Sequence, residues 1–513
     1  MMGRHSKKRW RPIVSAILTL LSAMVVAAYL VVPGMWQWNR AEAKVEAKRI
    51  HQVDTVPGEV DGALVQRLRD TSASAQSAPI IITYHDISYN PSRYTVTPEN
   101  FAAQMQLIHD AGWTTLTTDQ LDGWLGGAPL PPHSVMITFD DGATGVWQYA
   151  DPVLKRLDMH ATAFIITGFV GTHAPYYMTW DQVTELANNG HWDIEAHTHL
   201  GHVQVPSDNE GNEGPFLNTV AWLPDQHRFE THEEYRLRVN RDLTECKHQF
   251  ALHGLPEPKF FAYPFSAYRN DREGSGQPQA SVVSLYRAGL LDDAEFIAVT
   301  SAANVARGLI QRMDITADLS LDKFIRKIDL ASPLDPPAAQ PLSDVGGWSD
   351  EKQNEAAIDI ANGIVTIGTD TGEKVIRNYA PARSAMWNDY TVSVDVGGFS
   401  LPADGSQAGI SVLKPPGSAY EQEGRVDLTV YAHAYSIQGL VNIDRQPLVE
   451  ADRHHVVIDV TDTQVVVTVD DAPPTVIDIP PHAARTVGGG MALYAFRRTD
   501  VNPSLTFTNL TIS

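Results

Sequence analysis

The sequence of 513 residues contains one cysteine, Cys246. A single thiol cannot form an internal disulfide or a multi-thiolate metal site, so any bound metal must be held by histidine and carboxylate side chains. The cysteine does not identify the compartment, because domains of this size have cores large enough to be stable without disulfides. We expect Cys246 to be a small buried hydrophobic residue.

Positive charge is also scarce. The chain has 39 lysine and arginine residues against 61 aspartate and glutamate residues, and its formal net charge is -22. No basic cluster occurs beyond the first dozen residues that would follow a phosphate backbone. Nucleic acid is therefore excluded as an expected partner.

Long apolar runs are absent except at the N-terminus, where residues 13–32 carry no charge. At about 1.5 Å per residue this run spans a hydrocarbon core of about 30 Å. Basic residues precede it and Trp36 and Trp38 follow it, as at a membrane interface. We expect residues 1–36 to be a basic stub and transmembrane signal-anchor, in a single-pass membrane protein with its catalytic domain outside. The alternative is secretion after signal cleavage, although the nearest small-x-small site, Ala41-Glu42-Ala43, lies well past the run.

After a spacer at residues 37–78, short apolar runs alternate with amphipathic segments. Strands are predicted at 80–84, 134–139, 161–167, 193–197 and 259–263, and helices at 99–111, 146–157, 180–189 and 233–252. This alternation predicts an α/β fold with a parallel sheet or (β/α) barrel over residues 79–332. The long connection between residues 202 and 232 is of a length typical of functional insertions.

Proline marks a linker at residues 333–346, and helical periodicity disappears beyond it. Strands are predicted at 390–396, 425–431, 455–460, 464–469 and 504–510, with a hairpin-like turn at residues 470–471. Residues 347–513 are therefore expected to form an all-β sandwich. It resembles the laminin-G or lectin-like jelly rolls appended to carbohydrate enzymes, which implies a carbohydrate-binding domain.

Two polar segments follow predicted strands. Asp140 and Asp141 end the strand 134–139, and their carboxylates can reach one cavity only if Gly142 lets the strand turn there. The segment His197-Thr-His-Leu-Gly-His202 follows another strand. Histidine with carboxylate suits a divalent metal such as zinc, and three protein ligands with an open position are typical of a catalytic site.

Thr138-Phe139-Asp140-Asp141-Gly142 resembles the first motif of the NodB-homology polysaccharide deacetylases of carbohydrate esterase family 4, and the histidine segment resembles the second. The separation of five between His197 and His202 is similar to that of deacetylases acting on biofilm poly-N-acetylglucosamine. Thr83-Tyr84-His85-Asp86 and the insertion after the second motif are also similar to that subgroup. The resemblance covers about residues 79–330 and implies a distorted barrel.

The resemblance also implies roles for individual residues. Asp141, His197 and His202 would bind a divalent cation, with zinc expected, and His199 is a neighbour of undetermined role. Asp140 would be the general base and His85 the general acid that protonates the departing amine.

The family's third motif, Arg-x-Pro-Tyr, is replaced here by Ala262-Tyr263-Pro264-Phe265, so an arginine beside the base is not evident. The backbone N–H of Phe265 would still stabilise the oxyanion. A structural role is expected for Arg312-Met-Asp-Ile315.

Aromatic residues near these motifs are Tyr176, Tyr177, Trp180 and Trp192. They would either bind sugar rings or belong to the core.

The predicted function is metal-dependent N-deacetylation of an extracellular aminosugar polysaccharide, with poly-β-1,6-N-acetylglucosamine as the leading substrate. The alternatives are a peptidoglycan or chitin deacetylase, an ester-hydrolysing relative, and an inactive carbohydrate-binding or adhesive protein.

Overall fold

The computed structural model describes residues 50–71, 78–269, 278–292, 300–349, 358–368, 370–414, 424–480, 489–499 and 504–513. The predicted signal-anchor lies outside these residues. Among the helices that are described, none is both long and apolar enough to span a bilayer.

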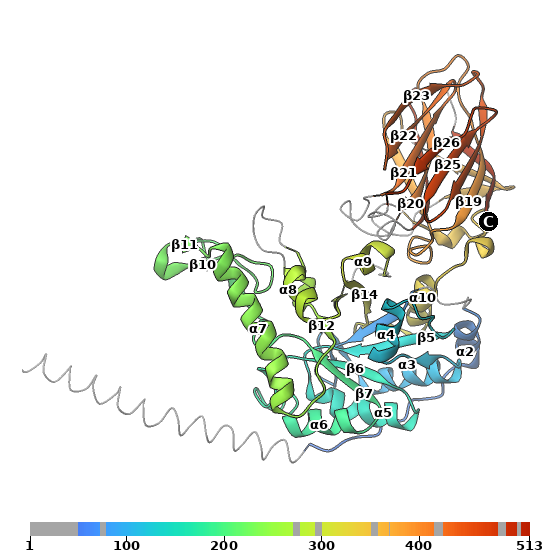
Figure 1. Ribbon diagram of the computed structural model, residues 1–513. Helices are drawn as coiled ribbons and strands as arrows, with labels where there is room; N and C mark the ends of the chain where they lie inside the picture. Colours follow the sequence, from blue (N-terminus) through green and yellow to red (C-terminus); the bar gives the residue numbers. More distant parts are fainter. Residues whose placement is uncertain are drawn as a thin grey trace, which may run out of the picture.

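The first domain is a closed barrel of seven parallel strands (Figure 1). Their order is β1 (Ile80–Tyr84), β14 (Leu309–Asp314), β13 (Ala288–Asp292), β12 (Phe260–Ala262), β7 (Trp192–Ala196), β6 (Ala161–Ile165) and β5 (Ser134–Phe139), and β5 pairs again with β1. The short strand β4 (Thr114–Thr115) adds to β5. The barrel predicted from the alternating pattern is therefore confirmed.

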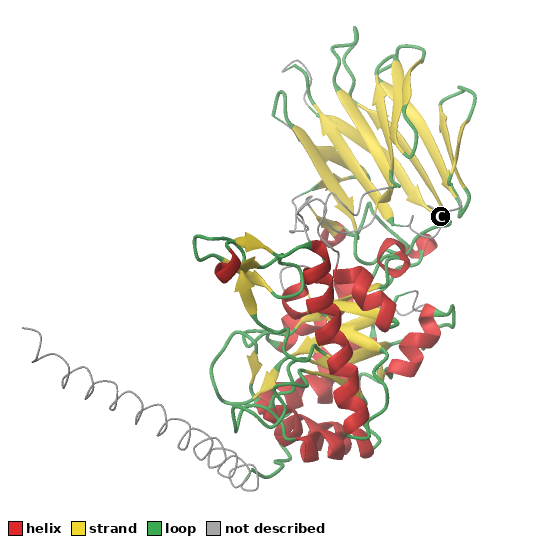
Figure 2. Cartoon of the chain, turned by 60° about the vertical axis from the view of Figure 1, so that its left-hand side comes forward, coloured by secondary structure: helices red, strands yellow, loops and turns green. Residues whose placement is uncertain are grey.

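Helices surround this barrel, as Figure 2 shows. They are α3 (Pro98–Asp110), α4 (Thr118–Leu125), α5 (Asp151–Arg156), α6 (Trp180–Asn188), α7 (His232–Leu252), α8 (Pro278–Leu285), α9 (Ala302–Ala306) and α10 (Leu321–Ala331), with a π-helical turn at Val146–Ala150. Capping boxes begin α4, α6 and α7 at Thr117, Thr179 and Thr231. Cys246 on α7 is buried in this layer, as expected.

Alternate strand residues separate two apolar clusters. Ile80 and Ile82 belong to the core between the strands and the helices, whereas Ile81 belongs to a second cluster. That cluster also contains Met136, Phe164, Phe260, Leu290 and Ile310, all from barrel strands. Because side chains alternate along a strand, this second cluster fills the barrel interior and supports the polar residues at the strand ends.

The predicted long connection forms two hairpins. They consist of β8 (Gln204–Pro206) with β9 (Glu213–Pro215), and β10 (Trp222–Leu223) with β11 (Arg228–Phe229). Arg238 of α7 forms an ion pair with Glu230 and donates to the carbonyl oxygens of Phe216 and Thr219. The insertion is therefore attached to α7.

The C-terminal region contains two antiparallel sheets of seven strands each. One is β15 (Trp348–Ser349), β18 (Lys374–Tyr379), β27 (Gly490–Phe496), β20 (Gln407–Lys414), β21 (Val426–Tyr431), β22 (Ala434–Gly439) and β23 (Ile443–Pro447). The other is β16 (Asp359–Ala361), β17 (Ile364–Ile367), β28 (Leu505–Ile512), β19 (Tyr390–Gly397), β24 (Arg453–Val460), β25 (Gln464–Val469) and β26 (Thr475–Asp478). Both sheets contribute to one apolar cluster, and the predicted turn at residues 470–471 joins β25 to β26. The likeness to laminin-G domains stays a prediction.

The second half of the predicted spacer is part of the folded body. Helix α2 (Gly62–Arg69) contacts α3 and α10, and Leu68 is fully buried in the barrel domain's core. The side chain of Gln52 donates to Asp151 on α5, and the N–H of Val53 donates to the carbonyl oxygen of Gln148. Because polar residues surround the short apolar face of α2, the sequence pattern did not predict that this helix packs on the barrel.

We predict that Leu68→Ala lowers the free energy of unfolding by about 2 to 5 kcal/mol, because it opens a cavity in the core. Val56, which is 72% exposed in the same segment, provides the control Val56→Ala, which should change stability by less than about 0.5 kcal/mol. Urea denaturation of the full chain and both variants measures the difference. Equal effects of the two substitutions would show that residues 50–71 do not pack on the barrel.

Candidate functional site

The first predicted motif turns sharply at the carboxyl end of β5. Asp141 has φ +70° and Gly142 has φ +85°, so two consecutive residues are left-handed. A Cβ at Gly142 would also lie 3.3 Å from Ile165. This turn sends the Asp140 and Asp141 carboxylates to different partners within one site, which a regular strand would not allow.

The structure brings the three predicted metal ligands together. The Asp141 Oδ1 atom lies 3.5 Å from His197 Nε2 and 3.3 Å from His202 Nε2. This oxygen is buried and has no hydrogen-bond partner in the described part of the chain. His197 Nδ1 donates to the Ala262 carbonyl oxygen at 2.8 Å, which leaves Nε2 free to face Asp141. Two imidazoles and an orphaned carboxylate oxygen fit a divalent cation, and zinc accepts this donor set.

The pKa of His202 also favours binding of a cation. Burial and the neighbouring His197 lower the pKa of His202 below its ordinary value. A neutral imidazole retains the lone pair that a cation requires.

His199 lies outside this group of ligands. Its ring contacts the Thr167 hydroxyl at 3.0 Å. Asp242 of α7 accepts the backbone N–H groups of His199 and Leu200 at 3.0 and 2.7 Å, and so it fixes the loop between the two ligating histidines.

The structure supplies the arginine that the third motif lacks, from another strand. Arg312 of β14 donates through both terminal nitrogens to the two oxygens of Asp140, each at 2.7 Å. Burial alone would raise the pKa of Asp140, but the Arg312 guanidinium holds it below its ordinary value. Arg312, for which a structural role was expected, is thus buried in direct contact with the predicted base, a contact that the sequence did not indicate.

His85 lies between two aspartates that sequence reasoning missed. Its Nε2 is 3.8 Å from Asp292 Oδ2, and its Nδ1 is 3.7 Å from Asp314 Oδ1. The three residues end the neighbouring strands β1, β13 and β14 or directly follow them. The ring of Tyr94 covers His85 at 4.9 Å between centroids. Burial, and then repulsion by Asp314, raise the pKa of Asp292 to about 6.

Phe265 occupies a left-handed turn beside the ligand group. Both Phe265 and Ser266 have positive φ, +56° and +49°, and the Phe265 ring lies 4.6 Å from the His202 ring. The Ser266 hydroxyl donates to the Asp292 carbonyl oxygen and accepts the Asp292 N–H. These two hydrogen bonds connect the Phe265 turn to the His85 cluster, which consists of His85, Asp292 and Asp314.

Two of the four predicted aromatic residues lie at the site. Tyr176 and Tyr177 are close enough to Asp141 for its charge to raise their pKa values, after burial as the larger cause, and the pKa of Tyr177 reaches about 12. Trp192 instead is only 4% exposed and donates to Asp151, and Trp180 stacks on His253 at 3.7 Å. The predicted sugar-binding role of Trp180 and Trp192 therefore finds no support in their positions.

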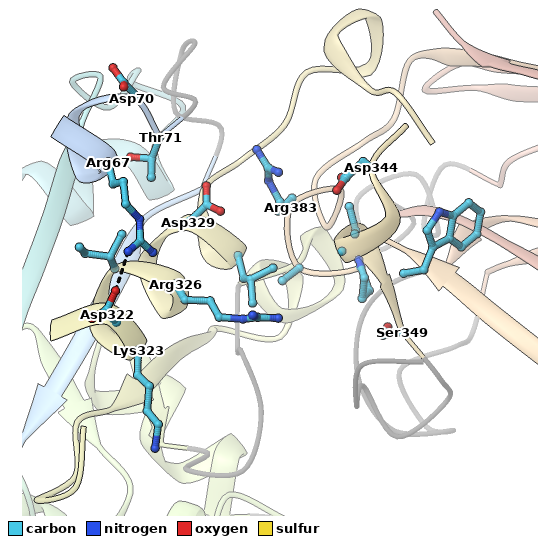
Figure 3. Close-up of a pocket in the computed structure, with 18 residues that line it drawn as sticks. Arg67, Asp70, Thr71, Asp322, Lys323, Arg326, Asp329, Asp344, Ser349 and Arg383 are labelled. Atoms are coloured by element: carbon cyan, nitrogen blue, oxygen red, sulfur yellow. Dashed lines mark hydrogen bonds and ion pairs between the residues drawn. The ribbon is translucent and has the colours of Figure 1, made fainter. Parts of the chain in front are cut away.

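A cavity of about 730 Å³ lies elsewhere, between α2 and α10 of the barrel domain and residues 344–349 and 380–383 (Figure 3). Charges of both signs line it, and Arg67 and Asp322 pair across α2 and α10 at 2.6 Å. It contains none of the predicted site residues.

We predict that Asp292→Asn flattens the dependence of stability on pH. The pKa of Asp292 rises from 3.8 to about 6 on folding, so its ionisation between about pH 4 and 6 removes stability as the pH rises. Thermal unfolding in the presence of a chelator should show a smaller loss over this range for the variant than for the unmodified chain. Asp181→Asn, an exposed change on α6, is the control. An unchanged slope in Asp292→Asn would contradict the raised pKa.

Known proteins resemble this chain over the barrel domain. Residues 127–275 match the polysaccharide deacetylase family. Poly-beta-1,6-N-acetyl-D-glucosamine N-deacetylase of Staphylococcus epidermidis is 27% identical over 184 residues, which cover 35% of this chain and 56% of that protein. The Escherichia coli K12 protein of the same name is 25% identical over 240 residues, which cover 44% of this chain and 34% of that protein.

Among solved structures, the deacetylase domain of BpsB from Bordetella bronchiseptica is 22% identical with a TM-score of 0.40, covering 47% of this chain and 97% of that one. The chain spans about half or less of the length of the Staphylococcus epidermidis and Escherichia coli proteins. The family match coincides with the segment that carries Asp140, Asp141, His197 and His202. The chain therefore contains a polysaccharide deacetylase domain of the NodB type, matched over residues 127–275.

Proposed function

We propose that this protein hydrolyses N-acetyl groups of an extracellular aminosugar polysaccharide with the help of a divalent cation. The observation that carries the proposal is the arrangement around Asp140. Arg312 holds this carboxylate, and one residue of each neighbouring group, His197 and His85, is near enough for its charge to lower the pKa of Asp140. The names of the two curated relatives favour poly-β-1,6-N-acetylglucosamine as the substrate.

Asp141, His197 and His202 would hold the cation, and zinc is the proposed metal because it accepts nitrogen and carboxylate ligands. When bound, the cation supplies Lewis-acid activation of water and of the acetyl carbonyl.

Asp140 acts as the general base. Its low pKa keeps it ionised at neutral pH, and Arg312 fixes the carboxylate in one orientation through two hydrogen bonds. Carboxylate oxygens have further lone pairs, so Asp140 can still accept the proton of the attacking water.

His85 acts as the general acid. An amine leaves readily only after protonation, and the His85 imidazole lies between Asp292 and Asp314 at the end of the barrel that carries Asp140. The Phe265 N–H would donate to the developing oxyanion, and the left-handed turn at Phe265, whose ring lies beside the His202 ring, fixes the backbone there. Tyr176 and Tyr177 would contact the sugar ring.

The proposal also includes the N-terminal apolar run and the C-terminal sandwich. Residues 13–32 would anchor the protein in the membrane with the barrel outside, or would be removed on secretion. The C-terminal sandwich would have the laminin-G-like or jelly-roll architecture and bind the same polymer.

The activity is tested by primary-amine release from N-acetylglucosamine oligomers of β-1,6 and β-1,4 linkage. We expect the purified full-length chain to release amine from the β-1,6 oligomers, a chelator to abolish release, and Asp140→Asn to lower it at least a hundredfold. Asp181→Asn should retain full activity, because Asp181 is exposed on α6.

Each other result has its own meaning. Preference for the β-1,4 oligomers would indicate a chitin-type or peptidoglycan-type substrate, and cleavage of acetyl esters alone would indicate an esterase. No release by the metal-loaded protein would contradict the proposal and favour a carbohydrate-binding function.

Arg312 provides a separate prediction. Arg312→Lys keeps a positive charge but loses the paired hydrogen bonds, so the pKa of Asp140 should rise and kcat should fall by about tenfold to a hundredfold. The acidic limb of kcat/KM should move to higher pH, because the base is then protonated over a wider range. A lower kcat with an unmoved limb would show that Arg312 does not set the pKa of Asp140.

A further inference from the structure

We propose that His85, Asp292 and Asp314 form a second divalent-cation site, and that a cation bound there inhibits the enzyme. The binding step is independent of the proposed function. The inhibition rests on it, because it assumes that His85 is the general acid.

The donor set suits a borderline cation such as zinc. One imidazole and two carboxylates converge from the ends of β1, β13 and β14, and one ligand atom from each lies within 4.8 Å of the other two. Nitrogen and oxygen donors from three separate elements leave further coordination positions for water.

Unpartnered atoms in the cluster are the second observation. His85 Nδ1, Asp292 Oδ1 and both carboxylate oxygens of Asp314 are buried and have no hydrogen-bond partner within the described residues. The Asp314 side chain is fully buried. Leaving four such atoms unsatisfied is unfavourable, and one cation with its waters would satisfy the group.

The neighbouring cations neutralise Asp292 and Asp314 only in part. Arg312 is adjacent, but both of its terminal nitrogens are engaged by Asp140. Lys327 donates to the main-chain oxygen of Asp314, so it compensates the carboxylate only in part. His85 alone cannot neutralise Asp292 and Asp314 when both are ionised.

The geometry predicts that this site is the weaker of the two. Ligands about 2.0 to 2.2 Å from a common ion lie roughly 3.0 to 3.5 Å apart. The contacts of Asp141 with His197 and His202, 3.5 and 3.3 Å, already match this separation. The contacts of His85 with Asp292 and Asp314, 3.8 and 3.7 Å, must shorten by a few tenths of an ångström, and the charge of Arg312 opposes the ion.

A cation at this site would inhibit the enzyme because it occupies His85, the proposed general acid. A His85 nitrogen that coordinates a cation can no longer donate a proton to the departing amine. Low metal concentrations should therefore activate the protein through the first site, and higher concentrations should inhibit it through the second.

Equilibrium dialysis of the full-length chain against zinc, with metal analysis, tests the site without relying on activity. The unmodified chain should bind one ion and then a second as free zinc rises. Asp314→Asn and Asp292→Asn should each lose the weaker ion and keep the tighter one. Asp141→Asn should lose the tighter ion and keep the weaker one. Asp329→Asn, a matched change on α10 outside both groups, should bind both.

A plateau at one ion per chain would overturn the second site. So would a second ion that persists in both Asp314→Asn and Asp292→Asn, because it would then be bound elsewhere. Circular dichroism of the variants separates lost ligands from lost folding, and the two variants give independent readings.

The inhibition has its own readout in amine release. The midpoint of inhibition by zinc should coincide with the dissociation constant of the weaker ion. Full activity with both ions bound would overturn the inhibitory role while leaving the site. A protein that binds both ions but releases no amine at any zinc concentration would instead contradict the proposed function alone.

Discussion

The paired hydrogen bonds between Asp140 and Arg312 are the interaction on which the site depends. Both side chains are almost completely buried, and a buried charge without its partner costs several kcal/mol. The pair forms only because the barrel closes. Thr83 of β1 is in register with Thr138 of β5 on one side and with Asp314 of β14 on the other. Residues 172 positions apart in the chain therefore meet at one end of the barrel.

The features that could be predicted from the sequence are those that do not depend on this closure. Asp140, Asp141, His197 and His202 belong to two short segments, so local pattern was sufficient to identify them, and the structure places the three expected ligands together. The barrel could be predicted because its strands and helices alternate with their own periodicities. The strands of the sandwich were recognisable for the same reason.

The site residues that the sequence did not reveal, Arg312 and Asp292, depend on contacts between segments that are distant in sequence. An arginine was sought at the position of Ala262, the last residue of β12, whereas the structure supplies it from β14. One local signal was present, because Arg312 and Asp314 are two residues apart at the end of an apolar strand and so share a face with Ile310. Asp292 gave no comparable signal, since its contact with His85 requires β1 and β13 to be aligned across β14, which lies between them.

Trp180 and Trp192, for which the sequence left sugar binding and a core position open, show a different limit. Aromatic residues next to catalytic motifs have similar sequence environments whether they face a substrate or the core. Trp192 packs inward because its indole N–H finds a buried acceptor in Asp151, which also accepts from Gln52 and Asn189. Asn189 is a near neighbour of Trp192 in sequence, but Asp151 and Gln52 come from two distant parts of the chain, so the pattern around Trp192 does not reveal them.

Buried carboxyl groups at the same end of the barrel have opposite protonation preferences. Arg312 lowers the pKa of Asp140, whereas burial and Asp314 raise the pKa of Asp292 to about 6. Hydrolysis of an amide needs one group that accepts a proton from water and another that delivers one to nitrogen. A single arginine, committed by geometry to Asp140, creates this difference, because it stabilises one carboxylate fully and leaves the other two to His85 and to each other. The opposite pKa shifts of Asp140 and Asp292 thus follow from which carboxylate the guanidinium reaches.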